Sequence, residues 1–320
     1  MSYSYVIGRN SVPLIFEGKL MGEGTFPIPP FSLRFQFSDP DYDPTKVTSW
    51  VDPSGITRTW LDGSYWVKVQ GTTENRWDWY YEDPNWDYAF EGAFRDSDNR
   101  VQVILGNTSD VHSMMNLFDE CMSLDSICWL DTAKVTTMRY MFGNTSITTV
   151  PLFDTSRVSI MSSMFAACDS LVTVPLFDTH KVEGMASMFI GCSSLQSVPL
   201  FDMGNVRYNQ YMFSGCTSLT SLPTFDTHNV EVMQSFCSGC SSLTNVPLLN
   251  TQSVTNMNYA FSGCINVEHG ALALYQQASS QEYPPSNHDD VFKNCGSNTA
   301  SGRAELLGIP QDWGGGTYVG

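Results

Sequence analysis

The chain has few basic residues. Its 320 residues include 16 Lys and Arg against 33 Asp and Glu, which gives a formal net charge of −17. The segment 109–270 holds 13 acidic and 5 basic side chains. Nucleic acids and anionic membranes are bound through clusters of Lys and Arg, so this composition argues against both as partners.

Long apolar runs and a secretory leader are also missing. No apolar stretch approaches the 18 residues that indicate a membrane-spanning helix. The first ten residues, MSYSYVIGRN, lack a charged region followed by a long apolar core, so they do not read as a secretory signal. Nothing in the sequence predicts insertion into a bilayer.

Catalytic and metal-binding motifs are absent as well. The chain has no H-E-x-x-H, G-x-S-x-G or P-loop pattern. The one C-x-x-C, Cys237 to Cys240, stands alone, and a second pair would be needed for a zinc site. We therefore predict no enzyme activity, no cofactor and no metal, although a carboxylate pair for glycoside hydrolysis stays open in so acidic a chain.

What the sequence does contain is a repeat. Val is followed at +3 by Met, at +6 and +7 by Met-Phe, at +10 by Cys and at +13 by Leu, and then by a run such as Val-Pro-Leu-Phe-Asp-Thr. Self-similarity at a fixed period predicts one small structural unit per period, stacked on its neighbours. The cysteines recur every 24 residues at Cys168, Cys192, Cys216, Cys240 and Cys264, and the units begin at Val111, Val135, Val158, Val182, Val206, Val230 and Val254.

Each unit is predicted as strand, turn and short helix. The V-x-x-M-x-x-M-F stretch has apolar residues at i, i+3, i+6 and i+7, as on one face of a helix. The L-x-x-V-P-L stretch predicts a brief strand with Leu195, Val198 and Leu200 inward and the prolines Pro151 to Pro247 as an outward stripe. Asp-Thr pairs provide turn and N-cap chemistry.

The stretch MFIGCSSLQSVPLFDMGNVRYNQYMFSGCTSL resembles the BspA-like leucine-rich repeats of bacterial surface proteins, over about residues 101–270. That resemblance implies a right-handed solenoid with a role in adhesion and no catalytic residues. The second unit departs from it by lacking a Cys after Phe142, and the sixth by having Phe236-Cys237 in place of Met-Phe. We expect an α/β leucine-rich-repeat-like solenoid of about seven 24-residue coils, with an N-terminal mostly-β domain and a C-terminal cap.

Composition sets the domain boundaries. Six of the eight Trp precede residue 87, before the repeats begin. Residues 1–100 are predicted as a mostly-β, Trp-rich docking domain, with strands in the alternating Phe31–Phe37 segment and around Val67, and a helix after Asn85. Residues 101–295 form the solenoid, and residues 296–320 a cap and tail. Helices are expected over Gly270–Ala278 and near Ala304–Leu307.

Two columns of equivalent side chains have structural interpretations. Stacked cysteines point the same way about 4.8 Å apart, farther than disulfide Cβ atoms stand, so a buried ladder of reduced thiols is expected. The second column is predicted to cap backbone N–H groups, with calcium binding as the alternative. It consists of Asp131, Asp154, Asp178, Asp202 and Asp226, and ends at Asn250.

Candidate ligand-binding residues are the variable, outward ones. Aromatic side chains beside Arg and Asn offer stacking faces and hydrogen bonds suited to glycans or proteins. Scattered surface tyrosines would give the same pattern, and Trp77, Trp79 and Trp86 are a second candidate cluster. The residues chosen are Tyr140, Arg207, Tyr208, Asn209, Tyr211 and Tyr259.

The predicted function is non-enzymatic binding to a host-surface glycan or protein. Because an adhesion module without a secretion signal needs another route outside, a phage virion protein with an exterior position fits best. Its N-terminal domain would dock to other virion proteins. The alternatives are a bacterial surface or cytoplasmic interaction protein of the same repeat family, and a carbohydrate-active enzyme.

Overall fold

The computed structural model describes residues 112–120, 122, 124–127 and 130–316, together with the backbone of seven short strands between Leu14 and Asn107. The helix expected after Asn85, the Trp77–Trp86 cluster and the tail at 317–320 lie outside the described residues. No helix among the described residues is long and apolar enough to cross a membrane.

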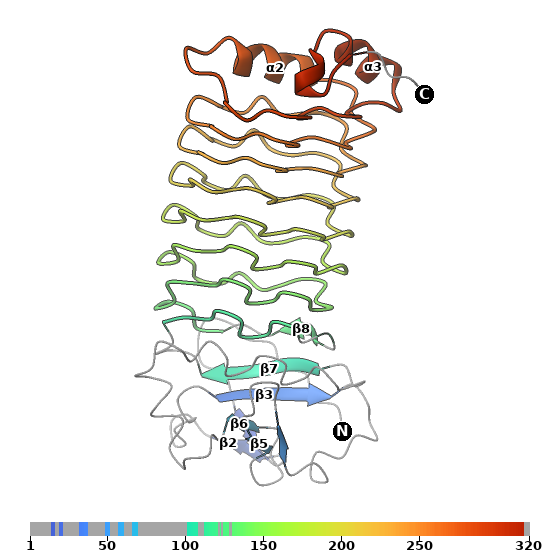
Figure 1. The fold of residues 1–320 in the computed structure, drawn as a ribbon. Helices are drawn as coiled ribbons and strands as arrows, with labels where there is room; N and C mark the ends of the chain where they lie inside the picture. The colour runs from blue at the N-terminus through green and yellow to red at the C-terminus, as the bar shows by residue number, and fades with distance from the viewer. Residues whose placement is uncertain are drawn as a thin grey trace.

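The N-terminal strands form two sheets. A two-stranded sheet pairs β1 with β2, and a six-stranded sheet has the order β4-β5-β6-β3-β7-β8. Strands β3 and β6 fall where the alternating pattern predicts them. Strand β7 pairs antiparallel with β3 and parallel with β8, so the sheet continues into the first repeat unit (Figure 1). The bounds are β1 Leu14–Phe16, β2 Lys19–Met21, β3 Ser32–Phe37, β4 Ser49–Val51, β5 Thr57–Trp60, β6 Trp66–Val69, β7 Val101–Asn107 and β8 Leu124–Ile127.

The repeats stack as successive coils of a solenoid (Figure 1). Equivalent residues of neighbouring coils form a row of isolated parallel β-bridges, at the second residue after each repeat Val and ending at Asn287, and Asn245 forms a further bridge with His269. The predicted repeat solenoid is therefore present, with strands reduced to one bridging residue. The bridges link Ser113, Thr137, Ile160, Gly184, Tyr208, Val232, Asn256 and Asn287 in order.

The V-x-x-M-x-x-M-F segment is not a helix, and that prediction was wrong. It is a run of overlapping turns, in which the Met164 amide donates to the Met161 carbonyl three residues earlier. The amides of Met161 and Ser163 instead donate to carbonyls of the next coil, Gly184 and Ala186. Because alternate N–H groups are satisfied between coils, the i→i−4 bonds of a helix are not needed.

Aromatic rings fill the interior of the coils. The +7 phenylalanines stack in parallel, as in Phe165 and Phe189 with ring centroids 5.5 Å apart and an interplanar angle of 6°. A second column stands beside it, with Phe177 at 6.3 Å from Phe165. In the sixth unit Phe236 occupies the Met position and packs edge-on to Phe213, at 82°. The stacking of the phenylalanine rings therefore changes from parallel to edge-on where the sequence departs from the repeat.

The cysteine column is buried, and its thiols donate hydrogen bonds. All seven described cysteines are free. The Cys192 thiol donates to the Phe165 carbonyl of the preceding coil at 3.0 Å, and the pattern recurs in the neighbouring coils. In the second unit Thr145 takes the cysteine's place and donates to the Phe142 carbonyl at 2.9 Å. Burial raises the pKa of the Cys168 thiol to about 11 and that of the Cys192 thiol well above its ordinary value, so these two thiols stay protonated at neutral pH.

The L-x-x-V-P-L stretch differs from its prediction in two ways. It forms no strand, and Leu200 faces outward with 60% of its surface exposed, while Leu195 and Val198 are buried as expected. Proline at 199 donates no ladder hydrogen bond, so the inter-coil bonds of this stretch come from residues before it, as where the Gln196 amide donates to the Val172 carbonyl. In that backbone Phe201 takes the inward place and Leu200 alternates outward.

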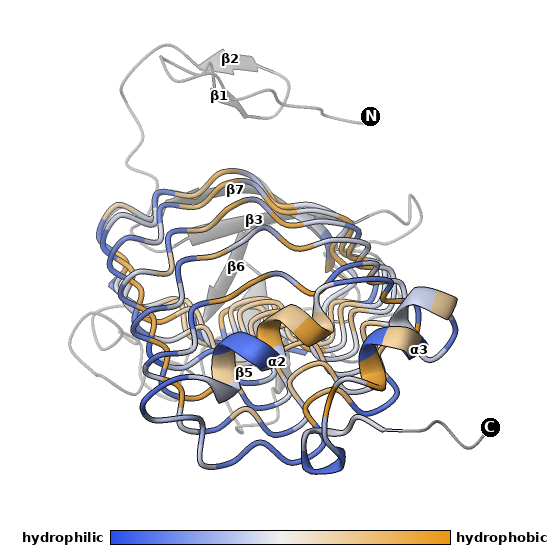
Figure 2. Ribbon diagram, turned by 90° about the horizontal axis from the view of Figure 1, so that it is seen from above, coloured by the Kyte–Doolittle hydropathy of each residue, from blue (hydrophilic) through white to orange (hydrophobic). Residues whose placement is uncertain are grey.

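Two helices close the C-terminal end of the stack (Figure 2). They are α2, Ala271–Ser279, and α3, Ala300–Leu306, followed by the short 3-10 helix η3, Gln311–Trp313. Helix α2 has no side-chain cap of its own. Instead, the Glu305 carboxylate of α3 accepts hydrogen bonds from the amides of Gly270 and Leu272. This contact satisfies the first turn of α2 and fixes the two helices to each other.

Candidate recognition face

We call the recognition face the surface formed by residues +1, +2 and +5 after each repeat Val. Five of the six predicted binding residues lie on it, at Tyr140, Arg207, Tyr208, Tyr211 and Tyr259. In one coil it brings together Arg207, Tyr208 and Tyr211. Tyr259 stands two coils further and Tyr140 three coils earlier, about 10 Å and 14 Å along the stack at the usual spacing of parallel strands.

Tyr208 is the most exposed of the four tyrosines, at 45%. Its backbone is held from both sides, because it bridges to Gly184 and to Val232. Its carbonyl also accepts from the Met185 amide at 2.9 Å. A large aromatic side chain on a fixed backbone loses little conformational entropy when it meets a ligand.

Tyr211 occupies a strained backbone position. Its φ is +59°, in the left-handed region that non-glycine residues rarely adopt, and Tyr140 and Tyr259 share this conformation in their coils. The phenol oxygen accepts a hydrogen bond from the Gln234 Nε2 of the next coil at 2.9 Å. Gln234 is in turn approached by Asn256 Nδ2 at 3.4 Å. The ring is thus half-buried and oriented by a polar chain that runs across the coils.

Arg207 on this face and Arg139, just before Tyr140, both have surface partners. The Arg207 Nη1 lies 3.4 Å from the Glu231 carboxylate, with both side chains largely exposed, so the pair contributes little stability. The Arg139 guanidinium lies over the Tyr140 ring at 5.3 Å from its centroid. Both guanidiniums remain accessible enough to meet an incoming polar group, since Arg139 and Arg207 are exposed.

Asn209 does not belong to the face, and its inclusion was wrong. The side chain is fully buried at the +3 position, where other coils place Met185 or Met233. Neither its Oδ1 nor its Nδ2 has a hydrogen-bond partner. The backbone amide donates to the Val232 carbonyl at 3.3 Å, longer than the 2.9 Å of the equivalent Met185 bond. The departure from the repeat at this position therefore lies in the core.

Residues that sequence reasoning missed are apolar. Ile160 stands at the +2 position of its coil and is 41% exposed, in the same column as Tyr208. The position could have been found by comparing the +2 residues of all units, which vary from Ser to Tyr. A second missed feature is the outward leucine of the Pro-Leu pair, as at Leu200.

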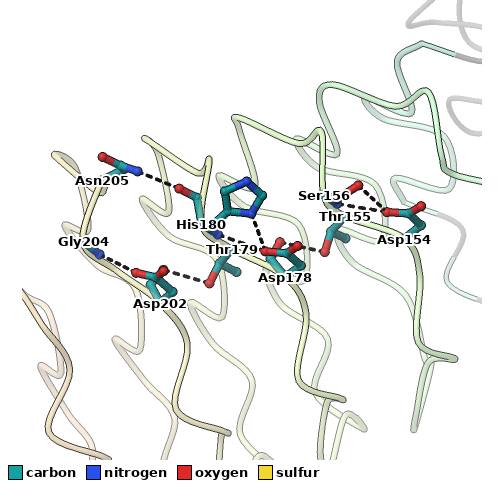
Figure 3. A network of polar contacts seen from close by, with 9 residues as sticks. All are labelled: Asp154, Thr155, Ser156, Asp178, Thr179, His180, Asp202, Gly204 and Asn205. Carbon is teal, nitrogen blue, oxygen red and sulfur yellow. Dashed lines mark hydrogen bonds and ion pairs between the residues drawn. The ribbon is translucent and has the colours of Figure 1, made fainter.

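The acidic column lies at a corner of the coils (Figure 3). Each Asp accepts from the backbone amide two residues later, as Asp178 does from His180 at 3.2 Å. The equivalent bond of Asp202 comes from Gly204 at 3.0 Å. The capping role predicted for this column is confirmed, and Asn250 makes the same bond with Gln252 at 3.0 Å. Among the described residues no group of three or more His, Cys, Asp or Glu is placed to hold a metal ion.

Histidine modifies two of these caps. The ring of His180 lies 2.6 Å from the Asp178 carboxylate, and His228 lies 2.8 Å from Asp226. The hydrogen bond from His180 lowers the pKa of Asp178, and that from His228 lowers the pKa of Asp226. Both carboxylates are therefore charged at neutral pH. Below them Thr179 donates to the Asp202 carbonyl at 2.8 Å, which ties one coil to the next.

The stacked coils, the single-residue bridges and the solvent-facing variable positions define a leucine-rich-repeat-like solenoid of the surface or binding type. The family model described as "Mycoplasma protein of unknown function, DUF285" matches residues 87–175, 144–248 and 171–275. These segments together cover more than half of the chain, and the protein belongs to this family of BspA-like repeats.

Comparison with individual proteins gives less information than the family match. No curated protein matches the chain. Among solved structures, a leucine-rich repeat protein from Bacteroides ovatus is similar at 13% identity, over 59% of this chain and 70% of that one. The TM-score is 0.22. A superposition this loose does not bear on the fold, which rests on the coil-to-coil contacts described above.

Proposed function

We propose that the protein is a non-enzymatic recognition module whose solenoid binds a glycan or protein on a bacterial surface. The observation that carries the proposal is the coil containing Arg207, Tyr208 and Tyr211. Within five residues of one coil it has an exposed aromatic ring, a second ring oriented by Gln234 and an accessible guanidinium, on a backbone bonded to the neighbouring coils. Tyrosine and arginine are the residue types enriched at binding surfaces.

The arrangement suits a ligand with both apolar and hydroxylated surfaces. A sugar ring or an aromatic side chain can lie on the Tyr208 ring, and the phenol and guanidinium groups can donate hydrogen bonds to its oxygens. Tyr259, two coils further, offers a second aromatic contact about 10 Å away. An extended partner that follows the stack would meet both.

The test is a double variant, Tyr208→Ala/Tyr211→Ala, assayed for attachment to bacterial cells by flow cytometry of labelled protein. We expect a folded protein whose attachment falls at least tenfold, as hot-spot tyrosines lose about 2 kcal/mol or more on truncation. Tyr283→Ala is the matched control, because Tyr283 is more exposed, at 77%, and lies outside the face. Equal loss in both variants, or none in the double variant, would contradict the proposal.

We further propose that the module is displayed on the exterior of a phage virion, with residues 1–100 attaching it to other virion proteins. Display on a bacterial cell surface is the competing placement, and the family resemblance supports it. Antibody labelling of purified particles and of intact producer cells separates the two. Signal on particles supports the virion placement, and signal on cells alone refutes it.

A further inference from the structure

A second surface lies on a different stretch of each coil. The leucines that follow the repeat prolines are all more than half exposed. They stand at equivalent positions of successive coils, and Thr224 replaces leucine in the fourth. We call this row the leucine stripe; it consists of Leu152, Leu176, Leu200 and Leu248. The prolines before the first three leucines are partly exposed and widen it. Exposed apolar side chains in a continuous row mark interaction sites more often than isolated ones do.

The borders of the stripe differ in charge. On one side, two residues after each of the first three leucines, stand capping aspartates, such as Asp178 and Asp202, and Asn250 follows Leu248. Their side chains point outward because the phenylalanine between leucine and aspartate is buried. On the other side, three residues before each leucine, the residues are exposed and uncharged, as with Thr173 and Ser197. The stripe is therefore apolar with one anionic edge.

Basic residues offset that edge only in part, as where Lys181 acts on the Asp178 carboxylate. Arg157 and Lys181 follow the aspartates by three residues and lie beyond the turn, while Asn205 and Asn229 fill this position in the next two coils. Asp178 and Asp226 expose half or more of their side chains. The histidine hydrogen bonds lower the pKa values of these two carboxyl groups, so both remain charged at neutral pH.

The distance between successive stripe leucines favours a helical partner. Successive stripe residues are about 4.8 Å apart, the spacing of neighbouring parallel strands. A turn of α-helix advances 5.4 Å, whereas two residues of a strand advance about 6.6 Å. A helix laid along the stack thus presents one apolar residue to each coil for several coils. The five coils from Leu152 to Leu248 span about 19 Å, or about 13 helical residues.

We propose that the leucine stripe docks an amphipathic α-helix of a partner protein, with leucine-like residues against the stripe and Lys or Arg along the flank that faces the aspartates. This site is separate from the recognition face and does not depend on it. A second copy of the chain fits the stripe less well, because the chain is strongly acidic and offers few cations to meet the aspartate row. The helix-in-groove mode of recognition relies on the same spacing of apolar anchors.

The probe is a fluorescein-labelled synthetic helical peptide of about 14 residues, with leucine at every third or fourth position and lysine along one flank. A matched peptide carries glutamate in place of lysine. Fluorescence anisotropy with the full chain is expected to show saturable binding of the lysine peptide at low ionic strength and none of the glutamate peptide. Failure of the lysine peptide to bind, or equal binding of both, overturns the proposal.

Three variants locate the site. Leu176→Ser/Leu200→Ser should weaken binding at least tenfold while circular dichroism stays unchanged, because both side chains are already exposed. Leu307→Ser is the control, an exposed leucine outside the stripe that should leave binding unchanged. Asp178→Asn/Asp202→Asn should weaken binding several-fold at low salt and little at high salt. Its fold should persist, since Asn250 already caps a coil in this column.

Self-association is the competing outcome. Sedimentation velocity should show the same oligomeric state for the parent and for Leu176→Ser/Leu200→Ser. A parent dimer that dissociates in this variant would assign the stripe to a second copy of the chain and refute the helix proposal. Peptide binding that is unchanged in the leucine variant would refute it as well. Neither result affects the Tyr208 and Tyr211 test, which uses another surface and another readout.

Discussion

Replacing Asn209 with Met should stabilise the protein. The other coils place a buried methionine at this position, as Met185 and Met233 do, and the amide of Asn209 has no partner for either polar atom. A buried polar atom without a hydrogen bond costs about 1–3 kcal/mol. Methionine also returns apolar contacts that the shorter Asn side chain lacks, at about 0.8 kcal/mol for each methylene group. We expect Asn209→Met to raise the free energy of unfolding by about 2–4 kcal/mol.

The reverse change in the adjacent coil is the matched control. Met185→Asn places the same polar group at the same repeat position, so it should lower stability by a similar about 2–4 kcal/mol. Urea unfolding followed by circular dichroism gives both midpoints. Because long repeat arrays can open coil by coil, hydrogen exchange of the amides in residues 206–229 should accompany it. An unchanged or lower midpoint for Asn209→Met would show that the buried amide is satisfied in solution and would refute this reasoning.

Three further changes test the packing and the acidic corner. Cys192→Ser should destabilise by about 1 kcal/mol and Cys192→Ala by about 2 kcal/mol, because serine can still donate to the Phe165 carbonyl; equal midpoints in urea would deny the thiol hydrogen bond. The lowered pKa of Asp178 means that its carboxylate contributes stability above the unfolded-state pKa of about 4, which is lost as the pH falls through the folded-state pKa. Asp178→Asn should therefore flatten the fall in urea midpoint between neutral and acidic pH, and a slope equal to the parent's would contradict this. EDTA should leave the melting temperature unchanged. A drop of several degrees that calcium reverses would show that the capping column binds a metal ion.

The core could be predicted from the sequence because every unit repeats it. Val182, Met185, Met188 and Phe189 are all fully buried, as the recurring apolar positions indicate. The same holds for the helix after Gly270, where the period is lost and apolar residues return at helical spacing. The core positions depend on contacts that recur in each unit, and the helix depends on its own local apolar spacing, so the sequence contains the signal for both.

The local conformation of the repeat could not be predicted in the same way. The apolar spacing of Met185, Met188 and Phe189 fits a helix, and it equally fits a chain of turns whose alternate amides bond to the next coil. Only the stacking, which no single unit contains, decides between them. Leu200 was misplaced for a related reason, because Phe201 beside it competes for the same interior and is the larger side chain.

The most direct test of the account is photo-crosslinking from the recognition face to intact bacterial cells. Tyr208→p-benzoylphenylalanine keeps an exposed aromatic side chain in place and reacts only with what lies against it. The account predicts a covalent adduct to a surface glycan or protein from this position and none from Leu307→p-benzoylphenylalanine, at a more exposed site in the cap. Adducts of equal yield at both positions, or none at Tyr208 from protein that attaches normally, would contradict it.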